Sequence, residues 1–200
     1  MGVLVGKSAP DFTAPAVMAD GTIVDEFNFK DYIKGKKAVL FFYPLDFTFV
    51  CPSELLAFSS RVDAFKERDT LVIGCSIDSH FTHNAWRNTD VNDGGIGSVK
   101  YPLVADMTHE ICKAYDVESA GGVAFRGSFL IDEEGVVRHQ VVNDLPLGRN
   151  IDDMLRTVDA LAFHEKHGEV CPANWKEGDA GMTASPDGVA SYLSKHGSGL

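Results

Sequence analysis

Residues 44–52, which read Pro-Leu-Asp-Phe-Thr-Phe-Val-Cys-Pro, join a continuously apolar stretch to an amphipathic one. The stretch before them, residues 38–43, is typical of a strand buried on both faces of a sheet. The stretch after them, residues 53–68, carries apolar side chains at the spacing of one helical face. These side chains are Leu55, Phe58, Val62 and Phe65. The sequence therefore predicts a buried strand, a short loop and a helix in succession.

Cys51 lies where this strand leads into this helix. Pro52 suits the first helical position, where the missing N–H of proline costs nothing. Glu54 falls in the first turn, where a carboxylate offsets the helix dipole. The unpaired N–H groups of a helix start favour a thiolate over a thiol, and the thiolate is the nucleophilic form. Taken alone, Cys51 is equally consistent with an inert buried thiol, because free cysteines are usually buried.

Composition and charge restrict the function classes. The chain has 200 residues, 44% of them hydrophobic, which suits one domain or one domain with a tail. A net charge of −11 argues against a nucleic-acid partner or an anionic membrane. The apolar runs are shorter than the ~20 residues of a membrane span, and the first residues do not form a secretory signal. We expect a cytoplasmic protein, in which four cysteines do not indicate a disulfide scaffold.

Strands and helices alternate along the chain up to about residue 125. Strands are predicted at residues 38–43, 70–77, 103–105, 127–131 and 136–142, and helices at 53–68, 81–88, 109–115, 151–167 and 189–196. The last two strands flank a short turn and form a hairpin. This order favours the α/β class, with a mixed sheet and helices on both faces. From residue 169 the chain becomes polar and rich in glycine, so we expect a domain over 1–168 and a tail over 169–200.

Pro44, Thr48 and Cys51 form the pattern P-x-x-x-T-x-x-C, which resembles the active-site signature of the peroxiredoxins. The resemblance runs from about Gly6 through Trp175 and is strongest to the typical 2-Cys subgroup, which includes the peroxidase subunit of alkyl hydroperoxide reductase. It implies a thioredoxin-like fold, a central mixed sheet flanked by helices. It also implies a thiol-dependent peroxidase that reduces hydrogen peroxide and organic hydroperoxides in antioxidant defence, without a cofactor.

The resemblance assigns roles to four residues of the active site. Cys51 is the peroxidatic nucleophile, and the Thr48 hydroxyl can bond its thiolate or the bound peroxide. Pro44 stiffens the loop and shields the sulfur from water. Arg126, in a G-x-x-x-R-G context, can stabilise charge as it moves to the leaving oxygen. Without the resemblance, Thr48 is equally a helix-entry residue, Pro44 a strand terminator and Arg126 a surface arginine.

Cys171 repeats the Val-Cys-Pro triplet of Cys51 and lies in the predicted tail. Peroxide attack would turn Cys51 into a sulfenic acid, which condenses with a second thiol. The resemblance implies that Cys171 is this resolving thiol, and that the Cys51–Cys171 disulfide joins the two chains of a homodimer. It also implies assembly into a decameric ring through residues 81–83, with Phe47 and Phe49. The expected reductant is thioredoxin or a dedicated flavoprotein reductase.

The remaining cysteines and two histidines are expected to be structural. Cys75 lies in an apolar strand and Cys112 beside Ile111 on a short helix, where inert core thiols are usual. His80 and His83 have no further ligands at a zinc-like spacing, so we expect no metal.

Two features bear on over-oxidation. Residues 94–97 lack the spacing of a nucleotide-binding loop. They are similar to a glycine motif of peroxiredoxins that over-oxidise readily, which usually carry a C-terminal Tyr-Phe. This chain has Tyr192-Leu193 instead, so moderate sensitivity is expected.

Three other readings compete with a peroxidase. A thioredoxin-type disulfide oxidoreductase would need a C-x-x-C motif, and neither Cys51 nor Cys171 has a cysteine at that spacing. A cysteine hydrolase would need a histidine held against Cys51, and the seven histidines show no recognisable pairing. A ring-forming holdase or scaffold without enzymatic activity stays open.

Overall fold

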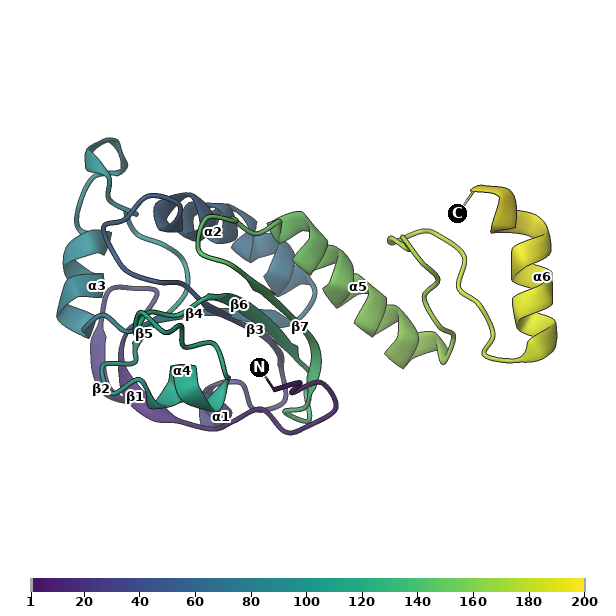
Figure 1. Cartoon of the computed structure of the whole chain (residues 1–200), viewed down its shortest axis with the longest axis horizontal. Helices are drawn as coiled ribbons and strands as arrows, with labels where there is room; N and C mark the ends of the chain where they lie inside the picture. Colours follow the sequence, from purple (N-terminus) through teal and green to yellow (C-terminus); the bar gives the residue numbers. More distant parts are fainter. Residues whose placement is uncertain (1, 200) are drawn as a thin grey trace. The chain divides into compact units, whose positions relative to one another are not determined.

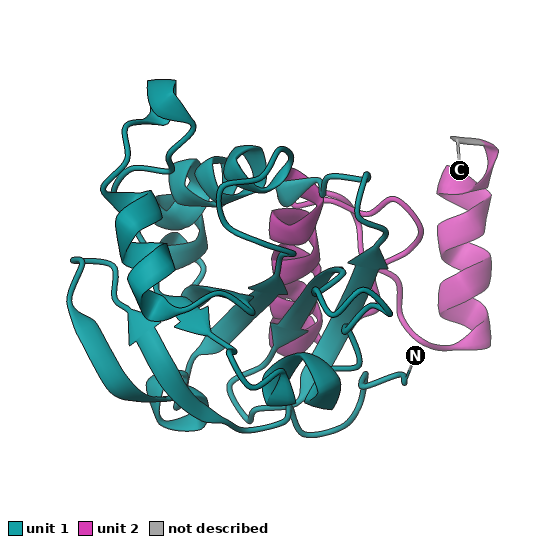
Figure 2. Ribbon diagram, turned by 60° about the vertical axis from the view of Figure 1, so that its left-hand side comes forward, with its two compact units in different colours: residues 1–151 teal, residues 152–200 magenta. Residues whose placement is uncertain are grey.

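The computed structural model describes residues 2–199. The chain divides into two compact units, residues 1–151 and residues 152–200 (Figure 2). The division predicted from composition, at residue 168, separates a peroxidase domain from a cysteine-bearing tail and stays a prediction. Within residues 2–199, no helix combines the length and the apolar character that crossing a membrane requires.

A seven-stranded mixed sheet forms the centre of the first unit, in the order β2-β1-β5-β4-β3-β6-β7. The β3–β4 and β4–β5 pairs are parallel, and the other pairs are antiparallel. The predicted mixed sheet is therefore confirmed. The strands are β1 (Thr13–Val17), β2 (Ile23–Asn28), β3 (Lys37–Phe42), β4 (Thr70–Ser76), β5 (Leu103–Ala105), β6 (Arg126–Ile131) and β7 (Val137–Asn143).

The sequence predicts a tight turn at Asp20-Gly21 between short strand-like pieces such as residues 22–24, but it gives no bounds for the piece that forms β1, and Pro15 at the centre of β1 explains why. Proline cannot donate to a sheet ladder, so a proline inside a strand is found mainly at edges and bulges. β1 is an internal strand, paired with β2 on one side and β5 on the other. Its register with β2 shifts between Ala14 and Ala16, so that Pro15 alone lies opposite two residues of β2, which carries the bulge. The irregularity accommodates the proline without breaking the sheet.

The helices lie within a few residues of their predicted positions. They are α1 (Phe29–Tyr32), α2 (Cys51–Glu67), α3 (His80–Arg87), α4 (Glu110–Ala114), α5 (Ile151–His167) and α6 (Pro186–His196). The short helix α1 is additional, and α5 has the predicted bounds. Helix α6 begins three residues early, because Ser185 caps it by accepting from the Gly188 N–H and Pro186 occupies its first position.

Strand β3 is buried along its whole length because both faces of the sheet are covered. Side chains alternate between the faces of a strand. Those of Ala38, Leu40 and Phe42 belong to a core shared with α1 and α4. On the other face, Phe41 stacks on Phe58 of α2 with ring centroids 4.1 Å apart. Figure 1 shows α2 on one side of the sheet and α1 and α4 on the other.

Candidate active site

Helix α2 begins at Cys51 itself, two residues before the predicted start. Cys51 therefore occupies the first helical position and Pro52 the second. The cap residue, Val50, provides no side-chain hydrogen bond to the first turn. Cys51 is 1% exposed, so the environment of its sulfur is set by the few protein groups that contact it.

The Thr48 hydroxyl is the nearest polar group to the Cys51 sulfur. Its Oγ1 lies 3.0 Å from Sγ and 2.7 Å from the Leu45 carbonyl oxygen. A hydroxyl has one hydrogen to donate and two lone pairs with which to accept. It can donate to Leu45 while the thiol is protonated, and turn to donate to the sulfur once that sulfur is an anion. The structure thus brings Thr48 and Cys51 together, as the pattern of the loop suggested.

Arg126, the first residue of β6, reaches the same sulfur from the sheet. Its Nη1 lies 3.5 Å from the Cys51 Sγ and donates to Glu54 Oε2 at 2.8 Å. Its Nε donates to the Leu145 carbonyl at 2.7 Å, which fixes the plane of the guanidinium. Arg126 is 4% exposed, so the alternative of a surface arginine does not hold.

Pro44 is buried in the loop that joins β3 to α2. Its shielding of the sulfur stays a prediction.

Glu54 and Arg149 complete the surroundings of the sulfur, and the sequence did not reveal this role for either. Arg149 donates from its backbone N and Nε to Glu54 Oε1, at 2.8 and 2.9 Å, and from Nη2 to Oε2 at 2.7 Å. Its Nη1 also donates to the carbonyls of Phe42 and Gly127, each at 2.8 Å. The three-residue spacing between Cys51 and Glu54 could have indicated the role of Glu54, because residues three apart are neighbours on the surface of a helix. No motif pointed to Arg149.

The charges of this group explain its chemical effect. Burial raises the pKa of Glu54, but the hydrogen bonds and charge of Arg149, followed by the charge of Arg126, outweigh burial and hold the pKa below its ordinary value of 4.5. Glu54 is therefore an anion shared by two guanidinium cations. The three charges sum to one net positive charge beside the buried sulfur, where it can stabilise negative charge that develops during a reaction.

Cys171 lies in the second unit, in a loop that folds back on itself. Its Sγ donates to the Ala160 carbonyl of α5 at 3.4 Å, and burial raises the pKa of this thiol. The preceding residue, Val170, pairs with Met182 through two backbone hydrogen bonds of 2.9 and 3.0 Å. Trp175 packs on Phe163 of α5 with ring centroids 4.9 Å apart. The loop that carries Cys171 is thus held to its own unit, and its pairing with Cys51 stays a prediction.

Cys75 of β4 and Cys112 of α4 lie in one hydrophobic core and are 0% exposed. Burial raises the pKa of both thiols, and Asp106 raises that of Cys112 further. Both are therefore held as thiols at neutral pH, which agrees with the inert role expected of them.

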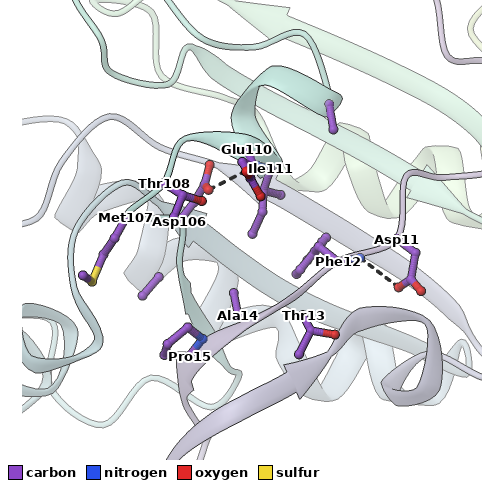
Figure 3. Close-up of a pocket in the computed structure, with 12 residues that line it drawn as sticks. Asp11, Phe12, Thr13, Ala14, Pro15, Asp106, Met107, Thr108, Glu110 and Ile111 are labelled. Carbon is purple, nitrogen blue, oxygen red and sulfur yellow. Dashed lines mark hydrogen bonds between the residues drawn. The ribbon is translucent and has the colours of Figure 1, made fainter.

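Two further features lie apart from this chemistry. Among residues 2–199, no group of three or more His, Cys, Asp and Glu side chains is arranged to hold a metal ion. A cavity of about 410 Å³ is open between β1 and the segment from β5 to α4 (Figure 3). Its lining includes Phe12, Ala14 and Ile111 but no cysteine, so it does not serve a reaction at Cys51.

A buried cysteine at the start of a helix, with a hydroxyl and a guanidinium as donors to its sulfur, is the arrangement expected of an enzyme with a cysteine nucleophile. Comparison with known families agrees: residues 5–140 match the AhpC/TSA family, and residues 160–195 match the C-terminal domain of 1-Cys peroxiredoxin. The chain belongs to the AhpC/TSA family.

The relatives are similar over nearly their whole lengths. Alkyl hydroperoxide reductase C of Buchnera aphidicola is 55% identical over 96% of this chain and 98% of its own. The protein of that name from Helicobacter pylori is 54% identical, over 97% of this chain and 98% of its own. Peroxiredoxin-1 of Gallus gallus is 51% identical over 96% of each chain. The reduced 2-Cys peroxiredoxin of Plasmodium vivax has a TM-score of 0.93 at 48% identity, covering 96% of this chain and 100% of its own. The predicted thioredoxin-like peroxiredoxin fold is confirmed.

Proposed function

We propose that this protein is a thiol-dependent peroxidase in which Cys51 reduces hydrogen peroxide and organic hydroperoxides. The observation that carries the proposal is the pair of donors on one buried sulfur: Thr48 Oγ1 at 3.0 Å and Arg126 Nη1 at 3.5 Å. The described partners of the Cys51 sulfur include no histidine, which disfavours a cysteine hydrolase with a Cys–His pair.

The first step is attack of the Cys51 thiolate on one peroxide oxygen. A sulfur–oxygen bond forms, the O–O bond breaks, and the electron pair of that bond leaves with the distal oxygen as hydroxide or alkoxide, which takes a proton. Donors preorganised in a water-excluded site stabilise such developing charge. The Arg126 fork suits this role because it can contact the sulfur and a peroxide oxygen at once. Thr48 donates to the attacking sulfur or to the peroxide.

The second step converts the Cys51 sulfenic acid into a disulfide. The Cys51 sulfenic acid condenses with the Cys171 thiol, with loss of water, and forms a disulfide. We propose that this disulfide joins the two chains of a homodimer, which assembles into a decameric ring. Thioredoxin or a flavoprotein reductase then supplies two electrons and two protons, and both thiols are restored. We propose that the protein is cytoplasmic, because such reductants keep thiols reduced in the cytoplasm.

A denaturing gel without reductant tests both steps together. Limiting hydrogen peroxide added to the reduced protein should produce a covalent dimer. The dimer should be absent from Cys51→Ser, which should consume no peroxide, and from Cys171→Ser, which should consume one equivalent. Cys75→Ser is the matched control and should behave as the wild type. A covalent dimer that persists in Cys171→Ser would reject the assignment of the resolving thiol.

A further inference from the structure

A buried polar cluster holds the loop that carries Thr48. The Tyr43 hydroxyl donates to Asp46 Oδ1 at 2.8 Å, and His83 Nδ1 lies 2.7 Å from Asp46 Oδ2. The side chains of Asp46 and His83 are both 0% exposed. Tyr43 follows β3, Asp46 lies in the loop before Cys51, and His83 lies on α3. The Tyr43–Asp46–His83 cluster therefore ties the active-site loop to a separate helix.

The hydrogen bonds of the cluster satisfy its buried polar side chains. His83 Nε2 lies 3.2 Å from the Val104 carbonyl, which can only accept, so Nε2 carries a hydrogen. Burial, followed by the charge of Asp46, raises the pKa of Tyr43 well above its ordinary value of 10.0, so Tyr43 remains a donor. Every polar atom that Asp46 presents is thus satisfied only while both partners are in place.

The backbone of the loop is held at the same residue. The Asp46 N–H donates to Asp78 Oδ2 at 2.8 Å, and this oxygen also accepts from the Ser76 hydroxyl at 2.9 Å. The next residue, Phe47, has φ of 52°, in the left-handed region that costs a non-glycine residue about 1–2 kcal/mol. Such a conformation persists only when its surroundings specify it. Asp46 supplies that specification one residue before Phe47 and two before Thr48.

We propose that the Tyr43–Asp46–His83 cluster positions Thr48 for peroxide attack and sets how readily the Cys51 loop opens. The proposal rests on the proposed peroxidase function. The Cys51 sulfur is 1% exposed, whereas a disulfide needs a second sulfur about 2.05 Å from it. The loop or the first turn of α2 must therefore move between the two steps. The closed loop favours reaction with peroxide, and the open loop favours condensation with a thiol.

The cluster thereby decides the fate of the sulfenic acid. In the open loop the sulfenic acid and a thiol give a disulfide and water. In the closed loop a second peroxide transfers one oxygen to the sulfenate, which gives a sulfinate and water or an alcohol. Weakening the cluster should slow the first attack and also protect the enzyme from sulfinic acid, two effects of opposite sign on activity.

Two conservative variants test the proposal in the full-length protein. Tyr43→Phe removes one hydroxyl donor, and Asp46→Asn replaces one carboxyl oxygen with an amide nitrogen while keeping the shape. The matched control is His109→Asn, because His109 and Glu118 form a similar histidine–carboxylate contact, 2.6 Å long, away from the loop. The rate constant with hydrogen peroxide, the rate of disulfide formation and the sulfinic acid content by mass spectrometry are measured for each protein.

We expect the peroxide rate constant of Asp46→Asn to fall about tenfold and that of Tyr43→Phe about threefold, because Asp46 takes part in both short hydrogen bonds of the cluster and Tyr43 in only one of them. In both variants disulfide formation should accelerate, and the sulfinic acid fraction at a given peroxide concentration should fall. A purely structural role would lower the melting temperature without changing the ratio of disulfide to sulfinic acid. That result, or an unchanged ratio in a folded Tyr43→Phe, would overturn the proposal.

Failure of this inference differs from failure of the proposed function. If the wild type consumed no peroxide, or if Cys51→Ser consumed as much as the wild type, the peroxidase assignment itself would fall. If the wild type behaves as a Cys51 peroxidase and the two variants partition their sulfenic acid as it does, only the role of the cluster is rejected.

Discussion

At the scale of single residues, two arginines and one glutamate surround the Cys51 sulfur, so the positive charges outnumber the negative one. Glu54 is shared by Arg126 and Arg149, through contacts of 2.8 and 2.7 Å to the same carboxylate oxygen. Glu54 holds both guanidinium groups in place and cancels one of their two charges. The remaining charge can stabilise negative charge that develops during a reaction, so a carboxylate three residues from the nucleophile assists that reaction through the arginines it positions.

We predict that the hydroxyl of Thr48 contributes to the rate of peroxide reduction. Thr48→Val keeps the branched shape but removes the donor that lies 3.0 Å from the sulfur. Loss of one preorganised donor to developing charge commonly costs about 10²-fold or more in rate. We expect a loss of this size in the rate constant with hydrogen peroxide, measured by competition with a second peroxidase. Thr48→Ser keeps the donor and should retain most of the rate; equal losses in Val and Ser would argue against a role for the hydroxyl.

The second residue-scale prediction concerns Glu54 and acid. Its pKa is lower in the folded protein than its ordinary value of 4.5, so ionised Glu54 stabilises the fold above that pH. This contribution should disappear as the pH falls below 4.5 and through the lower folded value. At neutral pH, Glu54→Gln should cost about 3–5 kcal/mol in the free energy of unfolding, because it leaves two buried cations without their anion.

Urea unfolding at pH 7 and at pH 3 measures this difference. The gap between wild type and Glu54→Gln should be large at pH 7 and clearly smaller at pH 3, because the stabilisation by ionised Glu54 starts to be lost below pH 4.5. Asp63→Asn is a suitable control, because Asp63 lies on the same helix with an exposed ion pair to Lys100. A gap that did not shrink in acid would show that Glu54 acts through packing rather than charge.

At the scale of secondary structure, α2 carries the nucleophile and is positioned by aromatic packing. Phe58 of α2 stacks on Phe41 of β3, and the Tyr101 hydroxyl donates to the Leu55 carbonyl of α2 at 2.7 Å. The guanidinium of Arg149 lies over the Phe41 ring, 5.1 Å from its centroid. One aromatic group thus supports both the helix that bears Cys51 and the arginine that neutralises Glu54.

We predict that Phe58→Ala lowers both the stability of the protein and its rate with peroxide. Phe58 is 1% exposed, and truncating such a core phenylalanine costs about 3–5 kcal/mol. The melting temperature should fall clearly, and the peroxide rate constant should fall as well because α2 loses its contact with β3. Phe58→Leu fills more of the space and should fall between wild type and alanine in both measurements. A stable Phe58→Ala protein would mean that α2 is held mainly by its polar contacts.

The elements with strong local signals could be predicted from the sequence. The apolar residues 38–43 and the periodic residues 53–68 gave β3 and α2, and α5 was predicted with its observed bounds. The bounds of β1 could not be predicted, because Pro15 interrupts the local strand pattern and the pairing of β1 with β5 joins residues almost 90 positions apart. Arg149 was missed for a similar reason: its contacts with Glu54 join residues 95 positions apart, and no local pattern encodes them.

At the scale of the whole molecule, the first unit exposes three large aromatic side chains. Phe49 is 94% exposed, Phe81 68% and Phe47 51%. Exposed apolar side chains indicate an interaction site when they form a large contiguous patch, whereas single ones are common on monomers. The resemblance to peroxiredoxins assigns the same residues to the contact between dimers, so we propose that they bury one another in a ring.

Phe49→Arg tests this assembly. A charge at the most exposed of these positions should be tolerated by the isolated fold but not by an apolar contact between subunits. Sedimentation velocity of the reduced protein should show a large oligomer for the wild type and dimers for Phe49→Arg. Val3→Arg, at a residue 63% exposed outside these aromatics, should leave the oligomer unchanged. If both variants sediment as the wild type does, the ring contact lies elsewhere.

The two tryptophans divide between the two units, and this gives the protein built-in optical reporters. Trp86 packs against Tyr43 and Phe47, with ring centroids 6.2 and 5.7 Å away, beside the cluster that holds the active-site loop. Trp175 lies four residues after Cys171 and packs on Phe163. Replacing either indole with phenylalanine would leave a single fluorophore, so emission could follow the nucleophile's loop and the resolving segment separately during one turnover, without any attached dye.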